Sequence, residues 1–191
     1  RLTVSGSNDG GVTWTAPLII GDASSGGQDT FNISDPAVGP NGEFYVAWHD
    51  LNNGQILFDA DTDGLWLGGD TFGVDTVAVT LNNEMFKSSV PAAPSRGIHT
   101  AGSLDVDLSG GPNHGRLYYS YADNTTGSAV DADIFVIRSD SGGVFWSAPI
   151  AVESGNGTDF LPWVDVDQAT GAVNFAYYST FGDVGTGNDE V

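Results

Sequence analysis

An eight-residue motif that occurs twice constrains this chain more than any other feature of its sequence. Its two copies are Ser7-Asn8-Asp9-Gly10-Gly11-Val12-Thr13-Trp14 and Ser139-Asp140-Ser141-Gly142-Gly143-Val144-Phe145-Trp146. We call residues 7–14 box 1 and residues 139–146 box 2. In a tight turn, Ser and Asp side chains bond neighbouring backbone groups and paired glycines supply positive φ. The motif therefore predicts two equivalent hairpins, each covered by its tryptophan.

The spacing of the boxes predicts an internal repeat. Trp14 and Trp146 are 132 residues apart, about twice a period of 66, which gives three units in 191 residues. Helical periodicity is close to absent, and short β-rich runs alternate with turns that use many of the 27 glycines. The sequence therefore predicts an all-β fold made of repeated sheets.

Each unit contains two β-rich runs joined by a turn. The paired runs are 35–38 with 44–50, 103–107 with 117–123, and 162–167 with 173–178. A third strand is expected at 55–58 and again at 134–138, and the latter leads directly into box 2. Four strands per unit at this period are typical of propeller blades.

Both boxes resemble the Asp-box, or BNR repeat, which is the S-x-D-x-G-x-x-W hairpin of sialidase-like β-propellers. Box 1 matches this pattern in full, and box 2 has Ser141 where the family has Asp. The matching structural positions are Ser7, Asp9, Gly11, Trp14, Ser139, Ser141, Gly143 and Trp146. The resemblance implies a sialidase-like β-propeller with about three four-stranded blades, half of a six-bladed ring. In that family the boxes lie on outer hairpins far from the catalytic centre.

We expect a single propeller segment rather than separate domains. Its predicted parts are the end of a blade (1–28), two blades (29–98 and 99–153) and the first half of another blade (154–191). The N-terminal strands of another copy or repeat would complete that half blade. Three blades are too few to close a ring, and open strand edges are prone to aggregation. The expected partner is therefore a second copy of the chain or adjacent repeats of a longer one.

The charge balance excludes several classes of partner. Five Lys and Arg stand against 25 Asp and Glu, for a formal net charge of −20. Such a field repels nucleic acid and anionic membranes. No apolar run approaches the ~18 residues of a membrane helix, so we expect no membrane insertion. An acidic chain without cysteine is common among secreted bacterial or salt-adapted proteins, and we expect an extracellular or cell-surface location.

The resemblance implies an arginine triad, a Tyr/Glu nucleophile pair and an Asp acid for any sialidase activity. The chain has only Arg1, Arg96, Arg116 and Arg138, and none lies in the Arg-Ile-Pro context of the family. No catalytic residue can be assigned. The leading hypothesis is a non-catalytic secreted or cell-surface module that assembles with itself and binds glycan. The alternatives are a sialidase-type glycoside hydrolase, completed by a second copy or missing sequence, and a purely architectural repeat.

A ligand is expected where loops enter the innermost strands of a propeller. The residues at these positions, the candidate ligand rim, are Asp35, His99, Ser103, Asp159, Phe160 and Trp163. Aromatic and acidic groups at such a rim can stack against a sugar and hydrogen-bond to it. The alternative is that Trp163 is buried between blades.

Two acidic patterns are candidates for cation binding. Asp59, Asp61, Asp63 and Asp70 fall at positions 1, 3, 5 and 12 of a loop like that of an EF-hand, which predicts Ca²⁺. The alternative is a solvated acidic hairpin in place of a missing box. The pairs Asp105/Asp107 and Asp165/Asp167 lie on one strand face each, and we expect them to bond to nearby turns rather than to a metal.

Overall fold

The computed structural model describes residues 2–21, 31–65, 72–82, 95, 97–124, 132–153, 155 and 157–181. Within these ranges the chain forms β-strands and turns, and no helix. The strands are β1 (Thr3–Val4), β2 (Leu18–Ile19), β3 (Phe31–Val38), β4 (Phe44–Asp50), β5 (Gln55–Asp61), β6 (Thr76–Thr80), β7 (Ala101–Val106), β8 (Leu117–Asp123), β9 (Asp133–Ser139), β10 (Ile150–Glu153), β11 (Asp159–Val166) and β12 (Val173–Ser179). The described part contains no helix long and apolar enough to cross a membrane.

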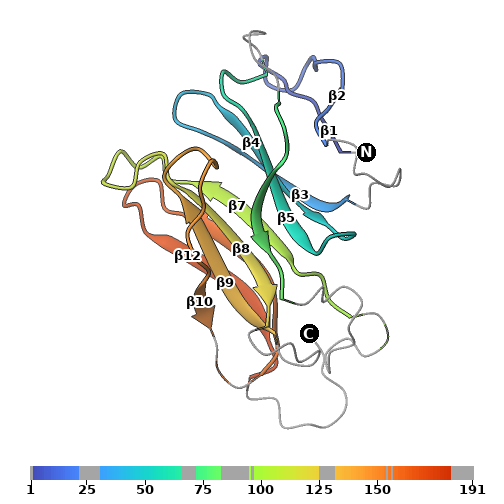
Figure 1. Ribbon diagram of the computed structural model, residues 1–191. Helices are drawn as coiled ribbons and strands as arrows, with labels where there is room; N and C mark the ends of the chain where they lie inside the picture. The colour runs from blue at the N-terminus through green and yellow to red at the C-terminus, as the bar shows by residue number, and fades with distance from the viewer. Residues whose placement is uncertain are drawn as a thin grey trace.

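Two four-stranded antiparallel sheets form the centre of the molecule (Figure 1). Blade 1 has the order β3-β4-β5-β6, and blade 2 has the order β7-β8-β9-β10. Each is a meander in which successive strands are neighbours, as the sequence analysis predicts for a blade.

Two half sheets lie on either side of these blades. The N-terminal hairpin pairs β1 with β2, and half-blade 3 pairs β11 with β12. Box 1 lies between β1 and β2, as box 2 lies between β9 and β10, so the N-terminal hairpin corresponds to the outer half of a blade. Half-blade 3 corresponds to the inner half, because its strands match the first two strands of blades 1 and 2.

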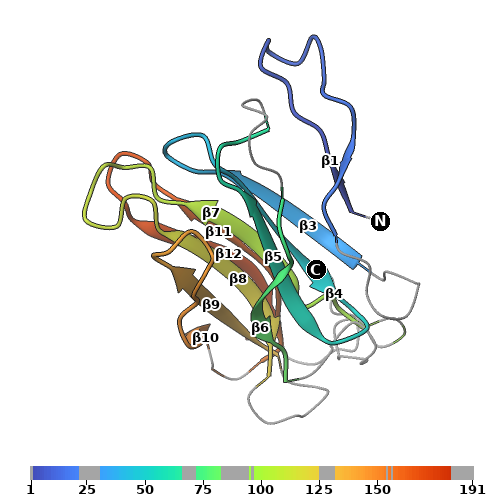
Figure 2. The same ribbon diagram turned by 45° about the horizontal axis from the view of Figure 1, so that its top comes forward.

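The sheets stack through apolar faces. Ala47 and Phe58 of blade 1 pack with Leu104 and Tyr119 of blade 2 in one core cluster. A second cluster joins the N-terminal hairpin to the opposite face of blade 1, around Trp48. A third joins blade 2 to half-blade 3 through Tyr118, Val164 and Val166. Blade 1 therefore lies between the N-terminal hairpin and blade 2, as Figures 1 and 2 show.

Each innermost strand carries an irregularity at a corresponding place. The register shifts between Asn32 and Ser34 in β3, between Ala101 and Leu104 in β7, and between Phe160 and Trp163 in β11. Ile33 and Leu161, inside two of these bulges, have φ of 45° and 51°. A bulge pins the register of a strand and bends it. The three innermost strands are thus held in equivalent positions.

Candidate functional site

Hydrogen bonds from side chains to the backbone connect the innermost strands of successive blades. Asp35 Oδ2 on β3 accepts the N–H of Leu104 on β7 at 2.8 Å. Ser103 Oγ on β7 accepts the N–H of Val164 on β11 at 2.6 Å. Ser103 occupies the same place in blade 2 as Asp35 in blade 1, so this inter-blade bond repeats from one blade to the next.

A second inter-blade bond lies two residues further along β7. Asp105 Oδ2 accepts the N–H of Val166 on β11 at 2.7 Å, while its Oδ1 accepts the N–H of Val106 at 2.8 Å. The corresponding residue in blade 1 is Ala37, whose side chain has no hydrogen-bond acceptor. The carboxylate of Asp105 is therefore engaged with backbone rather than with a ligand.

The second members of the two acidic pairs close turns, as the sequence analysis expects. Asp107 Oδ1 accepts the N–H of Ser109 at 2.8 Å. Asp167 accepts the N–H of Ala169 at 2.8 Å and the hydroxyl of Thr170 at 2.7 Å. Hydrogen bonds that favour the ionised form lower the pKa of both carboxyls, led in each case by the side-chain bond from Ser109 or Thr170.

Box 1 is held together by its own side chains. Ser7 Oγ accepts the N–H of Gly11 at 2.8 Å, and Asp9 Oδ1 accepts the N–H groups of Val12 and Thr13 at 3.0 and 2.9 Å. The hydroxyl of Thr13 donates to Asp9 Oδ2 at 2.6 Å. This bond, followed by the others, holds the pKa of Asp9 well below its usual value.

Box 2 repeats this scheme with fewer bonds. Ser139 Oγ accepts the N–H of Gly143 at 3.0 Å, and Ser141 Oγ accepts the N–H of Phe145 at 2.9 Å. These bonds are equivalent to those of Ser7 and Asp9. A hydroxyl at position 141 can therefore replace the carboxylate and still close the turn.

Box 2 packs against blade 1. The ring of Trp146 lies edge-on to Phe58, with ring centroids 5.3 Å apart. Gly143 has φ of 89°, and a Cβ there would lie 1.9 Å from the Phe58 ring. Glycine is therefore required at position 143 both by the turn and by the neighbouring blade.

The strand register places a degenerate box at the end of β5. Phe44, the first residue of β4, pairs with Asp61, and Leu117, the first residue of β8, pairs with Ser139. Asp61 thus stands where the boxes have their first serine. Gly64 has φ of 78°, close to the 63° of the equivalent Gly142. Burial, and then the neighbouring Asp63, raise the pKa of the Asp61 carboxyl.

The strand register places three of the four residues of the predicted calcium loop. Asp59 and Asp61 belong to strand β5, Asp63 follows it, and Asp70 lies outside the described residues. In the described part of the chain, no group of three or more His, Asp or Glu side chains is placed to hold a metal ion. The described members of the set follow the strand and the degenerate box rather than wrapping around one point.

The six residues predicted as a ligand rim occupy different environments. Asp35 and Ser103 form the inter-blade bonds, and burial raises the pKa of Asp35. Phe160 is buried and stacks on Tyr178, with ring centroids 5.7 Å apart. Trp163 is 62% exposed on β11, so it is not buried between the described blades.

The two remaining rim positions lie near the starts of innermost strands. His99 precedes β7 and is partly buried, and Asp159 is buried as the first residue of β11. The role of the six rim residues in ligand binding stays a prediction.

A buried histidine lies between blades 1 and 2. His49 on β4 is fully buried, and its Nδ1 is 3.1 Å from the hydroxyl of Thr100, which precedes β7. Burial, and then the nearby His99, lower the pKa of His49 to about 4. His49 is therefore neutral at pH 7, and its role is structural.

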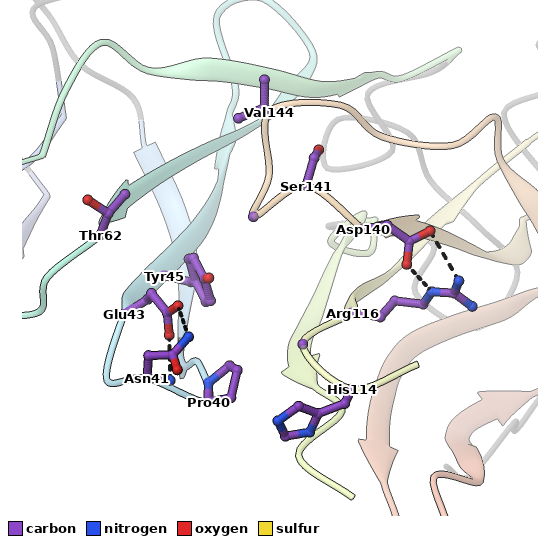
Figure 3. Close-up of a pocket in the computed structure, with 12 residues that line it drawn as sticks. Pro40, Asn41, Glu43, Tyr45, Thr62, His114, Arg116, Asp140, Ser141 and Val144 are labelled. Atoms are coloured by element: carbon purple, nitrogen blue, oxygen red, sulfur yellow. Dashed lines mark hydrogen bonds and ion pairs between the residues drawn. The ribbon is translucent and has the colours of Figure 1, made fainter. Parts of the chain in front are cut away.

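A cavity of about 530 Å³ opens between blades 1 and 2, beside box 2 (Figure 3). We call it the junction cavity. Its lining residues are Pro40, Asn41, Glu43, Tyr45, Thr62, His114, Gly115, Arg116, Asp140, Ser141, Gly142 and Val144. Figure 3 shows Glu43 and Tyr45 of blade 1 on one side, and Arg116 and Asp140 of blade 2 on the other.

The charged groups of the junction cavity are already paired. Arg116 binds Asp140 through two bonds, one of them from Nη2 to Oδ2 at 3.1 Å. This ion pair lowers the pKa of Asp140. Glu43 accepts two bonds from Asn41, both at 2.9 Å. The cavity thus offers carboxylate acceptors and a tyrosine wall, and its arginine is engaged.

Sequence reasoning missed the junction cavity because residues from four turns meet there. The signal that was present is Asp140 inside box 2 and Arg116 just after the β7–β8 turn. Only the stacking of blade 2 on blade 1 brings these two residues next to Glu43 and Tyr45.

The chain matches no protein-family model and no curated protein. It is similar in structure to a Hadza microbial sialidase, Hz136, with a TM-score of 0.51 and 18% identity over 85% of this chain and 32% of that one. It is also similar to the intramolecular trans-sialidase from Ruminococcus gnavus, with a TM-score of 0.51 and 14% identity over 92% of this chain and 37% of that one. The chain therefore spans about a third of these two proteins, and at this identity the likeness is one of fold.

The fold predicted from the sequence is confirmed. The chain is all-β, with antiparallel four-stranded sheets and sialidase-like structural neighbours, as expected for part of a propeller. Two blades are complete in the described residues, and two half sheets flank them. The described residues therefore have the fold of part of a sialidase-like β-propeller.

Proposed function

We propose that this chain is a non-catalytic, secreted or cell-surface propeller module that assembles with a second copy into a six-bladed ring and binds glycan. The two boxes are its Asp-boxes and serve structure. The observation that carries this proposal is the use of the innermost strands. Their polar side chains Asp35, Ser103 and Asp105 bond to the backbone of the next blade.

The arginines support a non-catalytic role. Arg116 is bound to Asp140 beside box 2, and Arg138 is exposed on β9, one residue before box 2. Arg1 and Arg96 lie outside the described residues. An arginine that binds a sialic-acid carboxylate needs its guanidinium available to the ligand. Arg116 does not meet this requirement, so among the described arginines only the exposed Arg138 has an available guanidinium, where the triad of the family needs three.

The junction cavity is where we expect glycan to bind. Its volume of about 530 Å³ lies in the usual range for small-ligand sites. The carboxylate oxygens of Glu43 and Asp140 can accept hydrogen bonds from sugar hydroxyls, and Tyr45 supplies an aromatic wall. The engaged Arg116 and the net charge of −20 favour a neutral sugar over an acidic one.

Binding can be tested on an array of neutral and sialylated glycans, followed by calorimetry on any glycan retained. We expect neutral glycans to bind the wild-type protein, and Glu43→Gln to weaken that binding about tenfold. Glu153→Gln makes the same change outside the cavity, at the end of β10, and is the matched control. Selective retention of sialosides, or binding unchanged by Glu43→Gln, would remove the junction cavity as the site.

The rival function is a sialidase-type glycoside hydrolase. The neighbours named above favour it, since one is described as a sialidase and the other as an intramolecular trans-sialidase. Turnover of a fluorogenic sialoside by the protein at high concentration tests it directly. We expect no turnover above the uncatalysed rate, and any turnover that depends on protein concentration would replace our proposal with this one.

The third reading is a purely architectural repeat that binds only Ca²⁺, at Asp59, Asp61, Asp63 and Asp70. It would gain if the glycan array stayed blank while 5 mM CaCl₂, a concentration above the ~mM affinity of extracellular modules, raised the Tm. Asp61→Ser restores the serine of a box and removes a carboxylate. We expect this variant to raise the Tm without calcium and to abolish any shift that calcium causes.

A further inference from the structure

Half-blade 3 and blade 1 each present an exposed face where their equivalents in blade 2 are covered. Ser103 on β7 is fully buried, whereas the corresponding Trp163 on β11 is 62% exposed. Val106 on β7 is 1% exposed, whereas the corresponding Val38 on β3 is 54% exposed. We call the face of β11 with Trp163 and Asp165 the leading face, and the face of β3 with Pro36 and Val38 the trailing face.

The inter-blade bonds show which hydrogen-bonding group each face has at the equivalent position in the other blades. In blades 1 and 2 a side-chain acceptor, Asp35 or Ser103, receives an N–H from the next innermost strand. The donors, Leu104 and Val164, occupy equivalent positions. On the leading face the acceptor position holds Trp163, whose indole accepts no such bond.

On the trailing face the donor position holds proline. Pro36 corresponds to Leu104 and Val164, and it has no N–H. The leading face therefore lacks the side-chain acceptor, and the trailing face lacks the N–H donor. Both are missing at the positions where the other blades make this bond. Suppose that a strand docked on the leading face had a residue other than proline at the position of Pro36. The N–H of that residue would then be buried against Trp163 without an acceptor, which is unfavourable. Only a strand with proline there avoids this cost.

A second pair of positions, two residues further along the strands, also matches the leading face to the trailing face. Asp165 corresponds to Asp105, whose Oδ2 accepts the N–H of Val166 at 2.7 Å. The donor in that position on the trailing face is Val38. The N–H of Gly39 donates to the carbonyl of Glu43, the residue just before β4, at 2.8 Å, and successive N–H groups alternate sides along a strand. The Val38 N–H therefore points away from β4, as the Val166 N–H does.

We propose that the leading face of one copy docks on the trailing face of a second copy, with Trp163 packed on Pro36 and Asp165 accepting the N–H of Val38. This inference rests on the proposed self-assembly and specifies its register. In a twofold ring the same contact occurs twice, because each copy contributes both faces. The N-terminal hairpin covers only the outer part of blade 1 on this side, around Trp48, so the inner part is open to the second copy.

The contact can be tested by a double-mutant cycle on the chain's self-association. Trp163→Ser alone places a hydroxyl against proline, and Pro36→Val alone places an N–H against tryptophan. We expect each to raise the dimer dissociation constant about tenfold or more. The double variant recreates the pair found at Ser103 and Val164, and we expect it to recover most of the lost affinity.

Sedimentation over a range of concentrations measures these constants, at 150 mM NaCl to screen the repulsion between two chains of charge −20. Phe145→Ser changes an equally apolar residue, 76% exposed in box 2 and away from both faces, and should leave the dissociation constant unchanged. Circular dichroism confirms that each variant is folded before it enters the cycle.

The possible outcomes separate this contact from the proposed assembly. A dimer whose two substitutions are not coupled would overturn the register and leave assembly intact. A folded wild-type monomer at all concentrations would overturn both. A second readout does not depend on the substitutions folding equally well: the emission of exposed Trp163 should shift to shorter wavelength as the dimer forms, and Trp163→Phe should remove that shift.

Discussion

Box 1 and box 2 have the same turn but different surroundings. In both, a serine Oγ accepts the N–H of the fourth following residue, Gly11 or Gly143. Trp14 is 64% exposed, whereas Trp146 packs on Phe58 of the preceding blade. The difference shows that the turn forms from local hydrogen bonds alone, while the tryptophan needs a neighbouring blade to be covered.

The two boxes also differ in how much they depend on their third residue. Asp9 accepts bonds from Val12 and from both polar groups of Thr13, whereas Ser141 accepts one N–H. Box 2 has contacts across the junction with Phe58 that box 1 lacks. The box with more internal bonds is thus the one without a described neighbouring blade.

The largest difference is expected for the second glycine of each box. Gly143→Ala places a Cβ 1.9 Å from the Phe58 ring, at φ of 89°. We expect it to lower the free energy of unfolding by about 3 to 4 kcal/mol, from backbone strain plus overpacking. Gly11→Ala has φ of 88° but meets nothing closer than Trp14 at 3.9 Å, so we expect about 1 kcal/mol. Urea unfolding of both variants measures the difference, and equal losses would contradict the comparison.

Acid should weaken the junction of blades 1 and 2 before it weakens box 1. The pKa of His49 is lowered from 6.5 to about 4, so its neutral form stabilises the fold fully above pH 6.5. That contribution, about 3 kcal/mol, is lost as the pH falls from 6.5 to about 4, because the unfolded chain then binds the proton first. The lowered pKa of Asp9 acts in a different window, since its contribution is lost only as the pH falls below 3.8.

Urea unfolding at pH 7, 5 and 4 measures this loss. His49→Gln keeps a polar partner for Thr100 and does not titrate, so the variant should lose less stability between pH 7 and pH 4 than the wild type. Parallel losses in the two proteins would show that His49 is not the group responsible.

The smallest difference is expected for the two tryptophans in the isolated chain. Trp146→Ala removes the ring that packs on Phe58 and should cost about 2 kcal/mol, since the side chain is partly buried. Trp14→Ala removes an exposed ring and should cost less than about 0.5 kcal/mol at low protein concentration. Thermal unfolding checks both values, and a large loss for Trp14→Ala would mean that box 1 has a contact of its own.

Much of the fold could be predicted from the sequence because its signals are local. The boxes, the turns and the alternating runs specify hairpins within about ten residues, and repetition at a period of about 66 gives their number. The turn bonds of Asp107 and Asp167 were also within reach of this reasoning.

The inter-blade bonds were not predictable in the same way. Asp35 and Leu104 are 69 residues apart, and only the stacking of blades brings them together. The sequence predicts a hairpin in place of a box near Asp61, but the register of this degenerate box was hidden for a related reason. Asp61 resembles a loop ligand in the sequence, and only the pairing of Asp61 with Phe44 identifies it with the first serine of a box. The junction cavity likewise depends on which turns meet.

The three bonds between innermost strands share a direction along the chain, although the N–H of Leu108, outside these strands, donates the other way, to Gln168. In all three, the acceptor precedes the donor in the sequence. Asp35 accepts the N–H of Leu104, Ser103 accepts that of Val164, and Asp105 accepts that of Val166. During synthesis from the N-terminus, each new innermost strand therefore emerges after the blade that holds its acceptor. We therefore expect the earlier blade to present these acceptors to the later one as it docks, in the order of translation.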